Sequence, residues 1–103
     1  MWSALEALTA TMDWMLEYDG DDPRAVVAGA TPFLRELGLV AGGWLMARSA
    51  IVAANSKDDD EFYKIKIATA RFYAANLLPQ VAAYAQAART GAAEIMAVPA
   101  EAF

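Results

Sequence analysis

Apolar residues recur at every third or fourth position along most of this chain, and that spacing restricts the fold to packed α-helices. At the start of the sequence the repeat consists of Trp2, Leu5, Leu8 or Thr9, Met12 and Leu16, while the acidic residues fall on other faces. An alternating apolar–polar run of convincing length, which a half-buried strand would require, does not occur. We therefore predict an all-α protein, built as an up-and-down helical bundle in a single domain covering residues 1–103.

Glycine and proline residues divide this pattern into three long helices. Pro32 cannot donate a backbone hydrogen bond and Thr31 can cap a new helix, so the second helix should break near residues 29–32. Pro79 lies well inside the third apolar pattern and should bend that helix. If both interruptions are sharp, a description as four helices also fits. The predicted segments are about 1–19, 23–54 with the break near 29–32, 58–90 with the kink at Pro79, and a short C-terminal turn.

The ends of these helices carry recognisable signals. Ser3 and Glu6 have the spacing of a capping box, which predicts that the first helix begins there. Gly91 is suited to the left-handed conformation that closes the third helix. The acidic run at 58–61 resembles a metal site, but four successive acids on a helix face different directions. Helix capping and the attraction of acids to the helix dipole explain this run better, so we predict no metal site.

Three glycines, Gly38, Gly42 and Gly43, lie inside the second predicted helix. Each glycine in a helix interior costs about 1 kcal/mol relative to alanine, so their presence requires a structural reason. Close approach of a neighbouring helix supplies this reason, and Trp44 should fill the space beside the gap. Together with Pro79, these residues are the candidates for close helix packing.

The composition excludes several classes of function. With 8 Lys and Arg against 13 Asp and Glu, the net charge is −5, so the chain is not expected to bind nucleic acid or an anionic membrane surface. The sequence has no histidine and no cysteine, which removes the commonest general base, cysteine nucleophiles and the usual zinc ligands. We therefore predict no catalytic, cofactor-binding or metal-binding residue. The absence of cysteine fits a cytoplasmic protein.

The most apolar run lies between Glu36 and Arg48, and that run is too short to cross a bilayer. Extending it to Ala54 would place the charge of Arg48 inside the lipid. We therefore predict that the chain has no transmembrane segment.

Two arginines, Arg48 and Arg71, stand within otherwise apolar stretches. One interpretation is that they contact a carboxylate or phosphate on a partner or ligand. The other interpretation, which we favour, is a side chain that reaches out to solvent or an internal ion pair with an acid such as Asp13 or Glu36.

The methionines and the third helix raise a related question about partners. Met12, Met15 and Met46 allow two interpretations, the lining of an acyl-chain pocket or packing in the core, and we favour the core. Apolar residues lie on two faces of the third helix, which predicts burial on two sides. We therefore expect a homodimer or a larger homo-oligomer.

The order of several short motifs is more specific than any of these features. From position 31 the chain contains Thr31-Pro32-Phe33-Leu34, Gly38, Gly43-Trp44, Arg48 and Ala50, and later Ala70-Arg71-Phe72-Tyr73-Ala74, Leu77-Leu78-Pro79, Gly91 and Met96. This combination resembles the extreme C-terminal helical extension of many bacterial acyl-CoA dehydrogenases. The resemblance covers roughly the last two-thirds of the sequence.

The resemblance implies a limited role for this chain. Acyl-CoA dehydrogenases bind FAD and use a glutamate base to remove the α-proton of an acyl-CoA thioester, and these functions belong to regions that precede the extension. FAD is therefore expected only in the full parent enzyme. The resemblance implies a non-catalytic accessory domain that packs against the dehydrogenase body or another subunit. The alternative is a free-standing helical module that binds an acyl chain or another apolar ligand.

Overall fold

The computed structural model describes residues 1–18, 20, 23–57 and 60–102, and every regular element within them is helical. The prediction of an all-α up-and-down bundle is therefore confirmed, with α1, α3, α4 and α5 as its four long helices. The elements are α1 (Trp2–Glu17), α2 (Arg24–Ala28), α3 (Ala30–Ala54), α4 (Glu61–Asn76), α5 (Gln80–Ala88), α6 (Ala93–Met96) and the 3₁₀-helix η1 (Ala100–Ala102).

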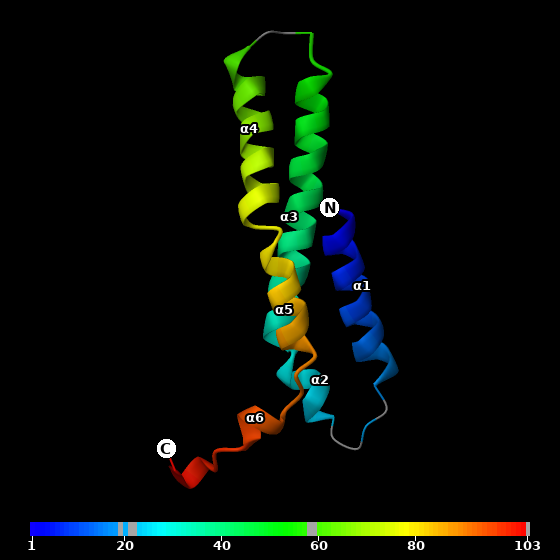
Figure 1. The fold of residues 1–103 in the computed structure, drawn as a ribbon, viewed down its shortest axis with the longest axis vertical. Coiled ribbons are helices and arrows are strands. Elements are labelled where there is room, and N and C mark those ends of the chain that lie inside the picture. Colours follow the sequence, from blue (N-terminus) through cyan, green and yellow to red (C-terminus); the bar gives the residue numbers. More distant parts are fainter. Residues whose placement is uncertain (19, 21–22, 58–59, 103) are drawn as a thin grey trace.

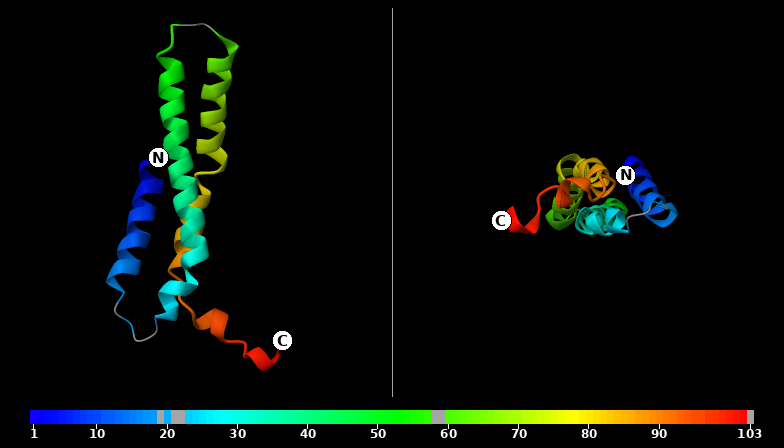
Figure 2. Two further views of the ribbon diagram at one scale, coloured as in Figure 1. Left: turned by 180° about the vertical axis from the view of Figure 1, so that it is seen from behind. Right: turned by 90° about the horizontal axis from the view of Figure 1, so that it is seen from below.

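Helix α3 is the spine of the molecule and runs through most of its length (Figure 1). Helices α1 and α5 flank one half of α3, and α4 runs antiparallel along the other half. We call α1, α2, α5 and residues 30–42 of α3 the base. Residues 43–54 of α3 together with α4 form a two-helix projection, which we call the arm. Seen along the long axis, α1, α3 and α5 occupy three corners, and α4 continues along the side of α3 that α5 covers in the base (Figure 2).

The break in the second predicted helix lies at Gly29, between α2 and α3. The expected position near residues 29–32 is right, but the expected cap at Thr31 is wrong because α3 already begins at Ala30. Pro32 lies in the first turn of α3, where the missing N–H would have had no partner within the helix. Gly29 is buried, and a side chain there would meet the backbone carbonyl of Ala88 in α5. The interruption is therefore fixed by the close approach of another helix.

Pro79 separates two helices and does not merely bend one, which corrects the prediction of a single kinked helix. Helix α4 ends at Asn76, and α5 begins at Gln80 directly after Pro79. The amide of Leu78 bonds to the carbonyl of Tyr73 at 3.1 Å, five residues back, which widens the last turn of α4. The proline ring cannot supply the N–H that would continue the helix, so α5 starts afresh.

The helix ends agree only in part with the sequence signals. The capping box at Ser3 and Glu6 is wrong, since α1 begins at Trp2 and has no side-chain cap. Asp60 caps α4 and accepts a hydrogen bond from the amide of Phe62 at 3.1 Å, while the rest of the proposed cap, at 58–59, lies outside the described residues. Gly91 has a φ of 89°, in the left-handed region, but α5 ends at Ala88 with Arg89 as its C-cap, so the predicted closure of this helix by Gly91 is wrong.

The hydrophobic core lies in the base and is small. Ala4 and Leu8 of α1 pack there with Val40 of α3 and Val81 of α5. The radius of gyration is 18.3 Å, compared with about 13 Å for a compact domain of this length. Such an elongated molecule leaves apolar side chains uncovered.

Helix α4 shows this lack of cover most clearly, because none of its residues is fully buried. The predicted burial of this segment on two sides is therefore wrong for α4 in the isolated chain. Phe62, Ile65 and Phe72 on the expected first stripe are 57–62% exposed. The second stripe is buried only where it continues into α5, at Val81, Ala85 and Ala88.

Helix α3 is long and apolar enough to cross a membrane by length and composition alone. It has 25 residues, its most apolar window has a mean hydropathy of 1.5, and 17% of that window is buried. The argument that the apolar run is too short is therefore wrong. A mostly buried core helix of a soluble protein and a signal sequence near an N-terminus can pass the same test, and α3 contacts α1, α4 and α5. The absence of a transmembrane segment stays a prediction.

Candidate interaction surfaces

The polar pair Thr11 and Glu36 lies at the contact between α1 and α3, and neither residue has any solvent exposure. The Thr11 hydroxyl lies 3.0 Å from the carbonyl oxygen of Ala7 and 3.1 Å from Oε1 of Glu36. A hydroxyl carries one proton and cannot donate to both oxygens. The carbonyl of Ala7 and Oε1 of Glu36 therefore compete for the single proton of the Thr11 hydroxyl.

The surroundings of Glu36 shift its protonation equilibrium toward the neutral carboxyl. Burial raises the pKa of Glu36 above its ordinary value of 4.5, against the opposing effects of the Thr11 hydrogen bond and the positive charge of Arg89. Among the described atoms, Oε2 of Glu36 has no hydrogen-bond partner. The pair is enclosed between two helices, so a substrate could reach it only if α1 moved away from α3. We therefore conclude that the Thr11–Glu36 pair attaches α1 to α3 and takes no part in a chemical reaction.

Gly42 and Gly43 mark the closest approach of α4 and the turn after it to α3. A side chain at Gly42 would overlap the hydroxyl of Tyr73, which donates a hydrogen bond of 2.7 Å to the carbonyl of Leu39. At Gly43 an added Cβ would lie 2.7 Å from Cδ2 of Leu78. The two glycines therefore make room for two different side chains, one from α4 and one from the turn before Pro79.

Gly38 and Trp44 do not take part in this packing, which corrects two of the predicted packing residues. A Cβ added at Gly38 would meet nothing within 4 Å. Trp44 is 52% exposed, and the space beside the glycines is filled by Tyr73 and Leu78. The reason is rotational, since one residue advances a helix by about 100° and turns Trp44 away from the face that carries Gly42 and Gly43.

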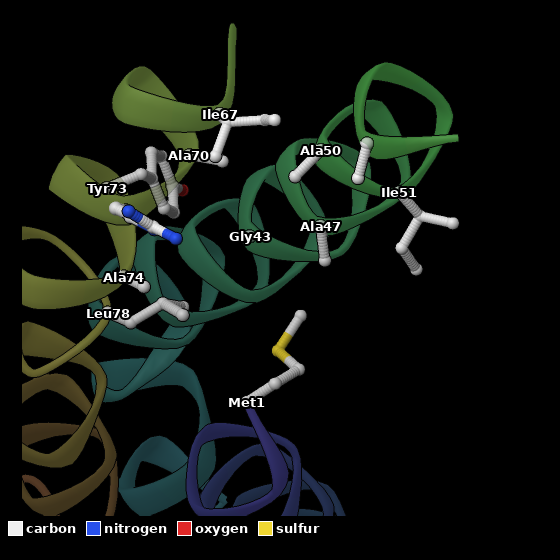
Figure 3. A pocket seen from close by; sticks show the side chains of 12 residues that line it. Met1, Gly43, Ala47, Ala50, Ile51, Ile67, Ala70, Tyr73, Ala74 and Leu78 are labelled. Atoms are coloured by element: carbon white, nitrogen blue, oxygen red, sulfur yellow. The ribbon is translucent and has the colours of Figure 1, made fainter. Parts of the chain in front are cut away.

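An open apolar groove runs along one flank of the arm, with a volume of about 470 Å³. We call it the inner groove. Alanines form much of its floor, and Met1 lies at one end with its side chain directed toward Ala47 (Figure 3). Its lining consists of Met1, Gly43, Ala47, Ala50, Ile51, Ala54, Ile67, Ala70, Arg71, Tyr73, Ala74 and Leu78.

A second groove, of about 370 Å³, lies between the same two helices, and we call it the outer groove. It is lined by Leu45, Arg48, Ser49, Val52, Ala53, Phe62, Tyr63 and Lys66. Ala53 is the buried member of this set, while Leu45, Val52 and Phe62 are more than half exposed. The arm therefore has apolar surface in both of its grooves.

The two candidate arginines each line one of these grooves. The guanidinium carbon of Arg48 lies 4.9 Å from the centre of the Trp44 ring, a cation–π contact on the surface of α3. Arg71 is exposed and lines the inner groove. The suggested internal ion pair with Glu36 is wrong for Arg48, because Glu36 bonds to Thr11. Contact of either arginine with a partner stays a prediction.

The residues lining the two grooves do not include Met12, Met15 or Met46. An acyl pocket built from those three methionines is therefore not what the arm provides. Among the described residues, no group of three or more His, Cys, Asp or Glu side chains could hold a metal ion.

Sequence reasoning missed Gly29, the Thr11–Glu36 pair and the position of Met1. In the sequence Gly29 indicates only a helix break, although its proximity to Ala88 is the tightest backbone contact among the described glycines. Glu36 could have been noticed as a single acid between Phe33 and Val40 on the buried stripe of α3. Its partner on α1 has no signal in the sequence, because Thr11 looks like any helical threonine.

Comparison with known proteins agrees with the motif resemblance and extends it. Residues 1–99 match the family model described as acetyl-CoA dehydrogenase C-terminal like. The chain is 37% identical over 83 residues to a 3-methylmercaptopropionyl-CoA dehydrogenase of Ruegeria pomeroyi, which covers 78% of this chain and 14% of that protein. No solved structure matches.

The family match includes α1, which the motifs did not reach, and it ends before the last residues of the sequence. The chain therefore belongs to the family of acetyl-CoA dehydrogenase C-terminal-like domains, helical C-terminal domains of acyl-CoA dehydrogenase-like proteins.

Proposed function

We propose that this chain is a non-catalytic packing domain of an FAD-dependent acyl-CoA dehydrogenase, and that its arm binds the dehydrogenase body or another subunit. The observation that carries the proposal is the exposed apolar surface of the arm. Ile65 and Phe72 of α4 are 58% and 62% exposed, and α4 has no fully buried residue. Large exposed apolar surface on a folded domain usually marks a site of protein–protein contact.

The energetics of the arm support this role. Burial of apolar surface contributes roughly 25 cal/mol per Å², and two helices alone can cover only the facing side of each other. Residues 43–54 of α3 and the whole of α4 would gain further stability from a third element packed against them. A dehydrogenase body or a neighbouring subunit is the surface that the family membership suggests.

The chemistry of the chain also favours packing over catalysis. Histidine and cysteine are absent from the sequence, and the acid with a raised pKa, Glu36, is enclosed between α1 and α3. The chain spans 14% of the Ruegeria pomeroyi dehydrogenase that it matches. We assign flavin binding and the catalytic base to the remaining part of the parent enzyme, and we place the protein in the cytoplasm.

The alternative function, binding of an acyl chain or another apolar ligand, is favoured by one observation. The inner groove is apolar and has a single exposed cation, Arg71, among its lining residues. A groove that is open along its side covers an acyl chain poorly, since ligand sites usually bury 70–90% or more of a ligand of this kind. We therefore give precedence to packing.

The test uses the full-length Ruegeria pomeroyi dehydrogenase with its C-terminal region replaced by this chain. We compare the parent chimaera with one that carries Ile65→Asp and Phe72→Asp, and with a control that carries Thr9→Asp on the exposed side of α1. The arm variant should lower the melting temperature or the oligomeric mass of the chimaera, measured by calorimetry and light scattering. The control should not. An arm variant that behaves like the parent would contradict the proposal.

A further inference from the structure

One face of α3 is covered in the base and uncovered in the arm. Glu36, Val40 and Gly43 recur at helical spacing on this face, and all three are buried. The same spacing continues through Ala47, Ala50 and Ala54, which line the open inner groove. Helix α4 takes over the side that α5 covers in the base, whereas no described element follows α1 along the arm (Figure 1).

Met1 lies at the point where this cover stops. Helix α1 approaches the inner groove at its N-terminal end, and the side chain of Met1 is directed along the groove toward Ala47 (Figure 3). The amide of Leu5 already bonds to the carbonyl of Met1 at 3.0 Å, and no side-chain cap closes this end of the helix. The backbone of α1 is thus in a conformation that a further helical turn can extend.

The family relationship supplies an occupant for this space. The matched region is 14% of the Ruegeria pomeroyi dehydrogenase, and the family is defined by the C-terminal part of such proteins. In those dehydrogenases the polypeptide therefore enters this domain at the end that α1 occupies here. The preceding segment starts beside the inner groove.

We propose that the inner groove binds a helix that continues α1 beyond Met1. In the dehydrogenases of the family, this helix is formed by the segment that leads into this domain. This inference rests on the proposed function and names the part of the body that the arm contacts. From Gly43 to Ala54 the groove follows about 16 Å of α3, which corresponds to about three helical turns. The third corner of the bundle, filled by α1 in the base, is then filled along the arm as well.

The lining of the groove specifies the chemistry of this helix. Ala47, Ala50, Ala70 and Ala74 are small, so a helix can approach α3 and α4 closely. The helix presents apolar side chains to this floor and an acidic side chain to Arg71. A second copy of the chain and a free acyl ligand are the competing occupants, and both are outcomes of the test below.

The experiment extends the chain at its N-terminus with the roughly 15 residues that precede the matched region in the Ruegeria pomeroyi protein, enough to span the groove. A control carries a Gly/Ser extension of the same length. The native chain has no cysteine, so Ala47→Cys reports on the inner groove, and Ala75→Cys reports on an exposed part of α4 that lines neither groove. The rate of maleimide labelling is measured for all four proteins, and again with a long-chain fatty acid added to the Gly/Ser protein.

We expect the natural extension to slow labelling at Ala47→Cys by about tenfold or more relative to the Gly/Ser extension, because labelling then requires the groove to open. Labelling at Ala75→Cys should be unchanged. Equal rates at Ala47→Cys with the two extensions would overturn the proposal. If labelling of Ala47→Cys in the Gly/Ser protein becomes slower as the protein concentration rises, the groove binds a second copy of the chain. If the fatty acid slows this labelling, the groove binds an acyl ligand. Either result would also overturn it.

This outcome is separable from that of the proposed function. If Ile65 and Phe72 stabilise the chimaera but the inner groove stays open to labelling, the packing role holds and the proposed helix-binding groove is refuted.

Discussion

Thr11 of α1 and Glu36 of α3 are joined by a hydrogen bond of 3.1 Å between two side chains that are both fully excluded from solvent. This contact connects the first helix of the chain to its spine, and burial raises the pKa of Glu36. The protonation of one carboxyl is therefore linked to the attachment of α1.

The sign of this linkage gives the first prediction. A carboxyl with a raised pKa in the folded state binds more protons there than in the unfolded chain. The free energy of unfolding should therefore fall as the pH rises above the ordinary value of 4.5, and should level off above the raised pKa of Glu36. Below 4.5 both states are protonated and the Glu36 contribution is fully present. Glu36→Gln should remove this slope and stabilise the protein at neutral pH, measured by urea unfolding between pH 4 and pH 8. A variant with the same slope as the parent would contradict it.

Two glycine-to-alanine substitutions should have opposite signs. At Gly29 the new Cβ would meet the backbone of Ala88, including its carbonyl carbon at 3.0 Å, so Gly29→Ala should cost about 1–3 kcal/mol through overpacking. At Gly38 the Cβ would meet nothing, so Gly38→Ala should stabilise α3 by about 0.5–1 kcal/mol. Chemical denaturation of both variants measures the difference. Two changes of the same sign would refute the assignment of Gly29 to close packing.

The contact between Gly42 and Tyr73 predicts a coupled pair. Gly42→Leu should cost about 1–3 kcal/mol, because the new side chain must displace the Tyr73 ring. In a background with Tyr73→Ala, the same substitution should cost less, with a coupling energy of about 0.5–3 kcal/mol. A double-mutant cycle by urea unfolding provides the measurement, with Tyr73→Phe to separate loss of the hydroxyl from loss of the ring. Additive effects would show that the two residues do not compete for the same space.

The exposed apolar surface of the arm predicts self-association of the isolated chain. Without a dehydrogenase body, this surface has another copy as its nearest apolar cover. Light scattering should report a dimer or a larger species at high protein concentration. A monomer at every concentration, together with no binding of a dye specific for apolar patches, would count against this prediction.

The isolated chain should also be colourless and inactive toward acyl-CoA. Hydride transfer to a flavin requires a site that orients the isoalloxazine ring and a positioned base, and the family match is to the C-terminal region alone. The purified protein should show no flavin absorbance and should not reduce an electron acceptor when FAD and acyl-CoA are added. A yellow preparation, or turnover by this chain alone, would reveal an overlooked site.

The sequence predicts the helical fold well because the helical signals are local. Apolar periodicity identifies three long helical segments, and the structure interrupts two of them, at Gly29 and at Pro79. Whether an interruption bends one helix or separates two helices depends on other parts of the chain. Pro79 divides two helices, and the second of them, α5, packs against α1 and α3.

Side-chain partners are harder to predict than helices, since they depend on which neighbouring element lies opposite each residue. Gly38 and Gly42 are four residues apart on one face of α3, yet a side chain at Gly42 would meet Tyr73 whereas one at Gly38 would meet nothing within 4 Å. Trp44 is large and apolar, but its direction places it beside Arg48 on the surface. The stripe of α4 could be recognised as apolar, whereas its exposure in the isolated chain has no signal in the sequence.

The contact between α1 and α5 has a consequence for the order in which the chain folds. Ala4 and Val81 meet in one core although they come from opposite ends of the sequence, whereas α3 and α4 are neighbours joined by a short connection. Contacts between distant segments form slowly, because the intervening chain must first lose its freedom. The arm can therefore assemble early from local contacts, and the docking of α1 onto α3 and α5 completes the native state.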